Sequence, residues 1–278
     1  MKVLLTGGCG YIGSSINESL RNLGHDVYIV DTNDGRRFQN LSDAVVRRHH
    51  AVIHLAASST VAQCDADPEL AIQNNIAGFS SIFDRLSDDQ VFIYASTGSI
   101  YNGTYYYADE NCHEFHPLSL YDITKFAGDQ IAAIKNRPRT YGLRFGTVAG
   151  ASPVMRWDSM INAMSMSACK NGFVDVYNTD AMRSVLCIQD LSQLVLSILE
   201  KKDARHGVYN VASFSETIGK IGSDVANYFD CDLDIHKETT KHYDFCMNCF
   251  SAQSEFGFQP TGTIRSICKS LEDILPLG

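Results

Sequence analysis

A glycine-rich segment near the start of the chain constrains the fold more than any other feature. Residues 6–13, TGGCGYIG, directly follow the apolar run Lys2–Thr6 and have the spacing G-x-x-G-x-x-G. Apolar residues then recur at helical spacing up to Gly24, which stands where a helix C-cap glycine belongs. A second apolar run, Val27–Asp31, comes next. The order strand, glycine turn, helix, strand predicts a βαβ unit.

Such a turn is suited to binding a dinucleotide. The glycines let the backbone turn tightly and approach a pyrophosphate, whose charge is stabilised by the free N–H groups of the helix N-terminus. Asp31 stands at the end of the second strand, where a carboxylate accepts hydrogen bonds from the adenosine ribose and repels a 2′-phosphate. This arrangement favours NAD over NADP. Arg36 and Arg37 could instead serve a 2′-phosphate, which leaves NADP as the alternative.

The same rhythm of short apolar runs and amphipathic stretches continues along the chain. The further runs are Ala51–Leu55, Val91–Ala95, Tyr141–Phe145, Val185–Ile188 and Val208–Val211. They predict an α/β fold with a Rossmann-type, doubly wound parallel sheet. Residues 150–180 and the tail after Ala212 break the rhythm. We therefore expect an NAD-binding domain of residues 1–149 plus about 184–212, and a smaller C-terminal substrate-binding domain of about 150–183 plus 213–278.

Composition excludes several classes of function. A net charge of -9 argues against a nucleic-acid partner, which needs a basic face, and any anionic ligand must be held by local groups. The first residues are too short an apolar run for a secretory signal, and no stretch is long enough to span a membrane, so a cytoplasmic protein is expected.

The nine cysteines are scattered along the chain, as is typical of reduced thiols and not of a disulfide framework. Only Cys246 and Cys249 have metal-like spacing; without further ligands they are expected to be packing thiols, and no metal is predicted.

A second set of residues indicates proton transfer. Tyr121 and Lys125 are four residues apart, which places them on one face of a helix. A phenol with an ordinary pKa near 10 is a poor base at neutral pH, so it needs a neighbouring cation that favours the phenolate. The run Val91–Ala95 ends in Ser96 and Thr97, whose hydroxyl groups can orient a substrate oxygen.

Together these features resemble the extended short-chain dehydrogenase/reductases of nucleotide-sugar metabolism, which include sugar 4-epimerases, dehydratases and ketoreductases. The resemblance runs nearly from end to end. Besides the glycine motif it is carried by HLAA (54–57), DP (67–68), NNIAG (74–78), STGSIY (96–101), YDITK (121–125), LRFGTVAG (143–150), RSVLCIQD (183–190), YNVA (209–212) and EFGFQP (255–260).

The resemblance implies roles for individual positions. Tyr121 is expected to be the general base, Lys125 its activator and a ligand of the nicotinamide ribose, and Thr97 the third catalytic residue. The implied NAD contacts are Gly7, Gly10, Tyr11, Ile12, Gly13, Asp31, Leu55, Ala56, Ala57, Asn75, Tyr121 and Lys125. The implied substrate contacts are Ser99, Thr147, Arg156, Asn162 and Arg183. Arg183 should grip the diphosphate, which a guanidinium can do in bidentate fashion, whereas Arg156 is equally well a surface charge.

The chain also departs from the family pattern. Too few residues separate Asp31 from His54 for the usual third strand, which leaves the adenine contacts open. Thr147 stands where many members have asparagine, and Asn102 replaces the usual glycine after Tyr101. Lys241 or Asp244 falls where an arginine for the second phosphate is often found.

The residue two positions after Thr97 separates the reactions of the family, because it lies beside the sugar ring. Dehydratases carry a glutamate there, whereas this chain has Ser99, which is neither a useful acid nor a useful base at neutral pH. We therefore expect oxidation and reduction at C4 of a nucleoside-diphosphate sugar without loss of water, foremost by a 4-epimerase. A 4-dehydrogenase or 4-ketoreductase is the alternative, and a non-catalytic dinucleotide-binding sensor is a third.

The resemblance finally implies a homodimer. In the family the helix that carries the tyrosine pairs across a four-helix bundle. Ile123, Phe126 and Ala127 would share its apolar face, although they could equally belong to the core.

Overall fold

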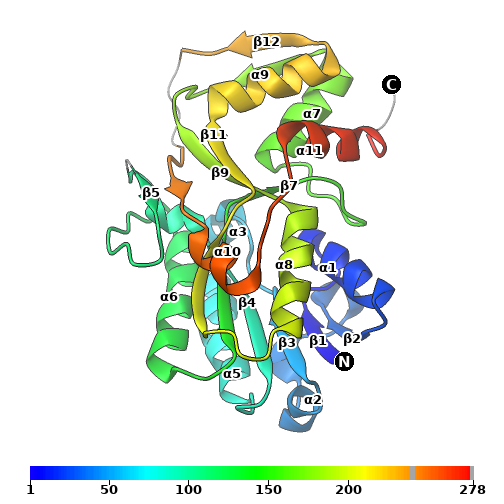
Figure 1. The fold of residues 1–278 in the computed structure, drawn as a ribbon, viewed down its shortest axis with the longest axis vertical. Coiled ribbons are helices and arrows are strands. Elements are labelled where there is room, and N and C mark those ends of the chain that lie inside the picture. Colours follow the sequence, from blue (N-terminus) through cyan, green and yellow to red (C-terminus); the bar gives the residue numbers. More distant parts are fainter. Residues whose placement is uncertain (105, 238–241, 276–278) are drawn as a thin grey trace.

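Six parallel strands form the central sheet of the protein (Figure 1). The computed structural model describes residues 1–104, 106–237 and 242–275. Across the sheet the strands are β10 (Gly207–Val211), β6 (Thr140–Phe145), β4 (Val91–Thr97), β3 (Ala51–His54), β1 (Lys2–Thr6) and β2 (Asp26–Val30). Every pair of neighbours is parallel. The α/β class and the Rossmann-type sheet predicted from the sequence are confirmed.

Alternating side chains of each strand enter two different cores. Val3 and Leu5 of β1 face one side of the sheet, whereas Leu4 between them faces the other, and all three are fully buried. Strand β4 divides in the same way, since Ile93 joins the first core and Phe92 the second. A sheet buried on both faces needs apolar residues at successive positions, which is why these strands appear in the sequence as continuous apolar runs.

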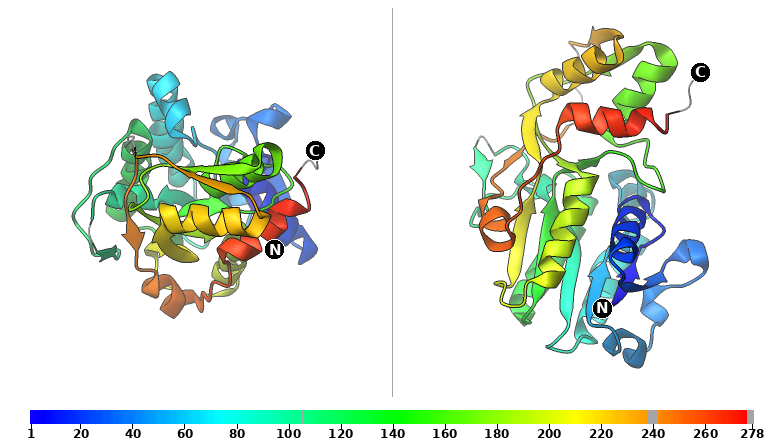
Figure 2. Two further views of the ribbon diagram at one scale, coloured as in Figure 1. Left: turned by 90° about the horizontal axis from the view of Figure 1, so that it is seen from above. Right: turned by 45° about the vertical axis from the view of Figure 1, so that its right-hand side comes forward.

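Helices cover both faces of the sheet. On the first face lie α1 (Tyr11–Asn22), α8 (Ile188–Glu200) and α10 (Phe250–Phe256). The second face carries α5 (Phe79–Asp84) and α6 (Leu120–Lys135), with α3 (Val61–Ala66), α4 (Pro68–Ile72) and the π-helical turn Gln73–Gly78 packed beside them. Figure 2 shows α1 and α8 on their side of the sheet.

The sheet ends at β2, as the short spacing after Asp31 predicted. Between β2 and β3 the chain forms only two single turns, Thr32–Asp34 and Phe38–Asn40, and the short helix α2 (Asp43–Arg47). All residues of this connection are described, and none of them forms a strand.

A smaller unit lies at one end of the sheet (Figures 1 and 2). It contains a three-stranded sheet of β11 (Phe214–Thr217), β9 (Met182–Cys187) and β7 (Thr147–Ala149), and a two-stranded sheet of β12 (Asp232–Ile235) and β8 (Phe173–Val176). Its helices are α7 (Met160–Asn171), α9 (Ile218–Phe229) and α11 (Ile264–Glu272), which share one apolar core. A further pair, β5 (Tyr107–Ala108) and β13 (Cys246–Met247), lies beside α6.

The strand β9 does not belong to the central sheet, although the alternation of apolar runs and amphipathic stretches predicts it there. The rhythm predicts the run Val185–Ile188 in the central sheet, but all of this run except its last residue belongs to β9, which pairs with β7 and β11. In the central sheet β6 and β10 pair with each other directly, from Tyr141 to Phe145, so β9 does not lie between them.

The structure also bears on a possible metal site and on membrane-spanning helices. Cys246 and Cys249 are both buried, and within the described ranges no group of three or more histidine, cysteine or acidic residues is placed to hold a metal ion. Among the helices of the described chain, none combines the length and the apolar character that crossing a membrane requires.

Candidate active site

A cavity of about 340 Å³ opens at the carboxyl ends of β1, β3, β4 and β6, where the smaller unit meets the central sheet. This is where ligands bind in open parallel sheets. The cavity brings together many of the residues proposed from the sequence. Those that line it are Gly7, Gly10, Tyr11, Ile12, Gly13, Leu55, Thr97, Ser99, Tyr121, Lys125, Thr147, Arg156 and Arg183.

The glycine turn forms one wall, and two of its glycines are required by geometry. Gly7 has a positive φ of 75°, and a Cβ atom there would lie 2.7 Å from the backbone nitrogen of Ala56. A Cβ atom on Gly13 would lie 2.0 Å from the carbonyl oxygen of Gly7. The following helix, α1, begins at Tyr11, and its N-cap residue Gly10 provides no side-chain cap for the first N–H groups.

Asp31 lies behind this turn and not in the cavity wall. Its carboxylate accepts hydrogen bonds from the backbone N–H of Cys9 at 3.0 Å and of Asn33 at 2.9 Å. Arg36, the possible ligand of a 2′-phosphate, pairs with Asp34 at 3.3 Å and donates to the carbonyl of Ile29. The carboxylate is therefore bonded to the glycine turn, and the nearby arginine is engaged elsewhere.

Ala56, Ala57 and Asn75 line a small second cavity behind Lys125. Asn75 is buried in the π-helical turn, where it bonds to both backbone groups of Ser58 and to the hydroxyl of Thr124 at 3.0 Å. Its amide thus fastens the loop after β3 to helix α6.

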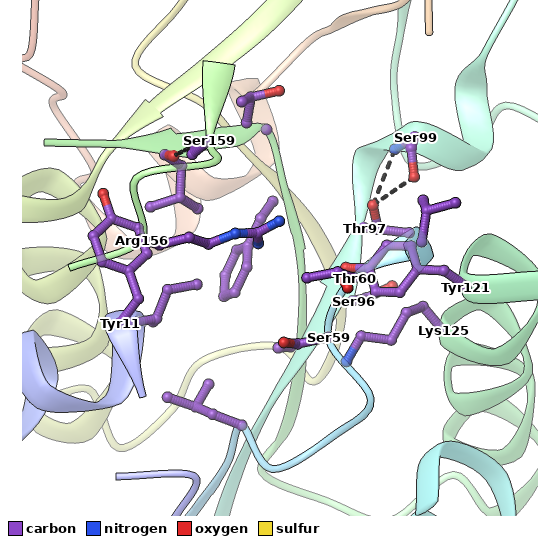
Figure 3. Close-up of a pocket in the computed structure, with 18 of the residues that line it drawn as sticks. Tyr11, Ser59, Thr60, Ser96, Thr97, Ser99, Tyr121, Lys125, Arg156 and Ser159 are labelled. Carbon is purple, nitrogen blue, oxygen red and sulfur yellow. Dashed lines mark hydrogen bonds between the residues drawn. The ribbon is translucent and has the colours of Figure 1, made fainter. Parts of the chain in front are cut away.

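The three proposed catalytic side chains converge on the main cavity (Figure 3). Tyr121 and Lys125 come from successive turns of α6, and Thr97 ends β4. Burial raises the pKa of Tyr121 to about 12, against which the Arg156 guanidinium and a hydrogen bond with Thr97 act. Burial lowers the pKa of Lys125 to about 8. The sequence assigned the activating cation to Lys125; in this arrangement the charge that lowers the pKa of the phenol is that of Arg156.

Ser99 joins Thr97 to a buried carboxylate. The two hydroxyl oxygens are 2.7 Å apart, and Ser99 donates to Oδ1 of Asp122 at 2.5 Å. Asp122 is fully buried. It follows Tyr121 in α6 and forms a capping box with Ser119, which explains why the helix begins there.

Arg156 reaches into the cavity from the loop before α7 and points toward Tyr121 (Figure 3). Asn162 does not line the cavity: it is fully buried and binds the carbonyl of Arg156 at 2.9 Å, the N–H of Gly150 and the hydroxyl of Tyr11. Tyr11 in turn donates to the carbonyl of Gly150 at 2.7 Å. Asn162 therefore holds the loop that presents Arg156 against the helix that carries the glycine turn.

Arg183 forms the opposite end of the cavity. Its guanidinium lies 5.8 Å from the ring centre of Tyr243 and 5.5 Å from that of Phe245, and its Nε is buried without a hydrogen-bond partner. Burial lowers its pKa to about 10. A buried donor without a partner is costly, so this cation is suited to an anionic ligand.

The structure adds lining residues that the sequence did not indicate. They include Ser59, Thr60 and Val61 in the loop after β3, Asp158, Ser159 and Met160 after Arg156, and Tyr243 and Phe245 near the C-terminus. Asp244 does not line the cavity but accepts from the backbone N–H of Met182 at 2.9 Å. Lys241 lies outside the described residues. The described residues 109–116 do not reach the cavity either, and Glu110 binds the N–H of Asn210 and the hydroxyl of Ser251.

The model of the NAD-dependent epimerase/dehydratase family matches residues 3–212 of the chain. The chain belongs to this family. The resemblance noted in the sequence is thereby confirmed, and with it an enzyme family whose members use NAD and act on nucleotide sugars.

Relatives of known sequence have several activities within the family. Protein CapI of Staphylococcus aureus is 29% identical over 72% of this chain and 70% of its own length. UDP-glucuronate 4-epimerase 6 of Arabidopsis thaliana is 30% identical over 66% of this chain, which corresponds to 47% of its own length. An ADP-L-glycero-D-manno-heptose-6-epimerase of Alkalilimnicola ehrlichii is 26% identical over 75% of this chain and 74% of its own length.

Solved structures with the same fold cover nearly the whole chain. The UDP-glucuronic acid 4-epimerase of Bacillus cereus, in complex with UDP-glucuronic acid and NAD, has a TM-score of 0.84 at 21% identity and covers 98% of both chains. The UDP-glucose 4-epimerase of Thermus thermophilus, in complex with NAD, has a TM-score of 0.81 at 21% identity, with 98% of this chain and 99% of that chain covered.

NAD, the cofactor of the family, fits the residues on this side of the cavity. Gly7 and Gly13 have no side chains to keep a pyrophosphate away from the backbone. Asp31, which is bonded to the same turn, would accept hydrogen bonds from the ribose hydroxyls. Lys125 lines the cavity where it would reach a second ribose. When bound, NAD supplies the group that accepts and returns a hydride.

Proposed function

We propose that the protein is a nucleoside-diphosphate sugar 4-epimerase. The observation that carries the proposal is the meeting of Thr97, Tyr121 and Lys125 in the cavity that begins at the glycine turn, with Ser99 and no glutamate beside Thr97. In this proposal Tyr121 accepts the proton of the sugar C4 hydroxyl during oxidation and returns it during reduction. Arg183 binds the diphosphate through its unpartnered Nε.

The acid groups of the cavity support oxidation and reduction without dehydration. Among the described residues that line it, the one carboxylate is that of Asp158, which is exposed and paired with Arg156 at 3.0 Å. Elimination of water requires a group that protonates the leaving hydroxyl, and a serine hydroxyl is far too weak an acid to do so. Without an acid to drive loss of water, the proposed reaction changes only the configuration at C4, and the product has the same mass as the substrate.

The test is incubation of the purified protein and NAD with a panel of nucleotide sugars, followed by chromatography and mass spectrometry. The names of the relatives select the first probes: UDP-glucuronic acid, UDP-glucose and an ADP-heptose. Because the Arg156 guanidinium faces Tyr121, we expect a sugar with a carboxylate near C4 to bind best. A C4 epimer of unchanged mass supports the proposal, and a product lighter by one water contradicts it.

The same experiment separates the alternatives. A product that differs by two hydrogens, with a matching change in NADH absorbance, marks a 4-dehydrogenase or 4-ketoreductase. Binding without turnover of any nucleotide sugar marks a dinucleotide-binding sensor. Retention of both Tyr121 and Lys125 in the cavity favours the enzyme over the sensor.

We also propose a homodimer through helix α6. Ile123 is 50% exposed and Ile134 is 83% exposed, and they lie eleven residues apart, on the same face of the helix. Phe126, which the sequence placed with Ile123 and Ala127, instead packs against Phe115, with ring centres 4.6 Å apart. Sedimentation at micromolar concentration should show a dimer that Ile134→Glu dissociates; a monomer would contradict this assembly.

A further inference from the structure

Asn162 in the first turn of α7 has a fully buried amide whose orientation is set by two backbone groups. Its Oδ1 accepts from the N–H of Gly150 at 3.0 Å, and its Nδ2 donates to the carbonyl of Arg156 at 2.9 Å. A backbone N–H can only donate and a carbonyl can only accept, so the amide cannot turn around. Asn162 therefore bonds to both ends of the loop from Gly150 to Arg156.

The hydroxyl of Tyr11 joins the same network. The second proton of the Asn162 amide is directed at this hydroxyl, 3.3 Å away, and the hydroxyl donates its own proton to the carbonyl of Gly150 at 2.7 Å. Tyr11 is the first residue of α1 and directly follows the glycine turn at Gly10. The loop that ends at Arg156 is thus bonded to the helix that begins at the glycine turn.

The side chain of Arg156 depends on how this loop is held, because the residue belongs to neither a helix nor a strand. Its Nε donates to the exposed carboxylate of Asp158 at 3.0 Å. Its guanidinium points across the cavity toward Tyr121 (Figure 3). The two Nη groups of an arginine can bind a carboxylate in bidentate fashion, provided that the guanidinium is held in place.

We propose that Asn162 is a positioning residue for substrate specificity. Together with the hydroxyl of Tyr11 it holds Arg156 where the guanidinium distinguishes a sugar that carries a carboxylate from one that does not. Asn162 does not line the cavity, so it acts through Arg156 and not on the ligand itself. This inference rests on the proposed function for the class of ligand, a nucleotide sugar with its C4 at Tyr121, but it does not depend on turnover.

Crystal structures of the wild-type protein and of Asn162→Leu, both with NAD bound, test the positioning without any sugar. Leucine has a similar size but makes no hydrogen bond, so the N–H of Gly150 and the carbonyl of Arg156 lose their buried partner. Because unpaired buried groups are costly, the loop should move toward water and displace the guanidinium from Tyr121. An unmoved guanidinium overturns the proposal. Since no substrate is involved, this result stands apart from that of the nucleotide-sugar panel.

Calorimetry tests the effect on specificity, with UDP-glucuronic acid and UDP-glucose as probes and Tyr121→Phe as the parent protein to prevent turnover. We expect the parent with NAD to bind UDP-glucuronic acid about tenfold more tightly than UDP-glucose. Asn162→Leu should reduce this ratio to about threefold or less and change the affinity for UDP-glucose less than about twofold; after Arg156→Gln it should change the ratio no further. A parent that binds both sugars equally, an unchanged ratio in Asn162→Leu, or equal weakening of both sugars overturns the proposal.

Two further variants separate positioning from support of the fold. Tyr11→Phe removes one hydroxyl from the network but leaves the bond from Asn162 to Arg156, so the ratio should fall less than in Asn162→Leu. If Asn162→Leu does not fold, an unchanged ratio in Tyr11→Phe overturns the proposal. Ser165→Ala is the matched control, because Ser165 is also fully buried on α7 but donates only within the helix, to Ile161 at 2.9 Å. It should lower the melting temperature and leave the ratio unchanged; a fall equal to that of Asn162→Leu would show that loosening α7 is sufficient.

Discussion

Two walls of the cavity are built from different parts of the chain. The glycine wall, Gly7 to Gly13, presents backbone, and its shape is set by close backbone contacts within the turn and with Ala56 after β3. The arginine wall presents side chains from two places: Arg156 from a loop that Asn162 of the following helix holds, and Arg183 from β9, where it lies against Tyr243 near the C-terminus. A backbone wall has no tolerance for added atoms, whereas a side-chain wall can be altered one charge at a time.

The largest effect is therefore expected at Gly13. In Gly13→Ala the new methyl group would lie 2.0 Å from the carbonyl oxygen of Gly7, so the turn must shift. We expect NAD binding, measured by calorimetry, to weaken at least about a hundredfold and the free energy of unfolding to fall by about 3 kcal/mol. Gly10→Ala is the control for stability, because its methyl group meets the same oxygen at 3.4 Å. Equal stability of the two variants would contradict the rigid wall.

Tyr121 lies between the two walls, and its loss should abolish chemistry without disturbing either. Tyr121→Phe removes the proton acceptor while the ring remains buried on α6. Turnover should fall by a factor on the order of a hundred or more. NAD affinity and melting temperature serve as controls and should not change. Near-normal activity would exclude Tyr121 as the base.

Arg183 should affect binding of the nucleotide sugar and little else. Arg183→Gln removes the charge proposed to bind the diphosphate, and we expect KM to rise about tenfold with a smaller change in kcat. Arg265→Gln is a matched control, because Arg265 lies at the same 5.8 Å from a tyrosine ring, that of Tyr228, outside the cavity. A similar rise in KM in both variants would refute a specific phosphate contact.

The smallest effect is expected for Arg156, through the dependence of activity on pH. Arg156 lowers the pKa of Tyr121, and the other charged or titratable groups that act on this phenol are Asp122 and Cys64, which raise it. Arg156→Gln should therefore raise the pKa of Tyr121. The acid limb of the kcat/KM profile moves to higher pH, by roughly half a unit, because a higher pH is then needed to form the phenolate. Arg156→Lys, which keeps the charge, should retain the wild-type profile.

The difference between the walls also explains what the sequence could predict. The strand Lys2–Thr6, the turn after it and the helix up to Asn22 depend on local spacing, and they were predicted to within two residues. The absence of a further strand between β2 and β3 followed from the few residues between Asp31 and His54, set against the family pattern.

Other features depend on contacts that no local pattern encodes. Tyr243 enters the cavity wall because its hydroxyl donates to Asp122, 121 residues earlier in the chain. Asp122 itself gave no signal, since a carboxylate in the first turn of a helix is ordinarily a solvated cap. Strand β9 has the composition of a central strand, but it pairs with β7 and β11, which no local pattern indicates.

The edge strand β2 has a consequence for solubility. A strand at the end of a sheet exposes backbone groups to which a strand of another molecule can add, a route to aggregation. Here two guanidinium groups occupy that edge: Arg21 donates to the carbonyl of Val27 at 2.7 Å, and Arg36 to that of Ile29 at 3.2 Å. An incoming strand would have to displace both and bring its own backbone against two positive charges. Replacing both arginines with alanine should leave the fold intact yet make concentrated solutions scatter light.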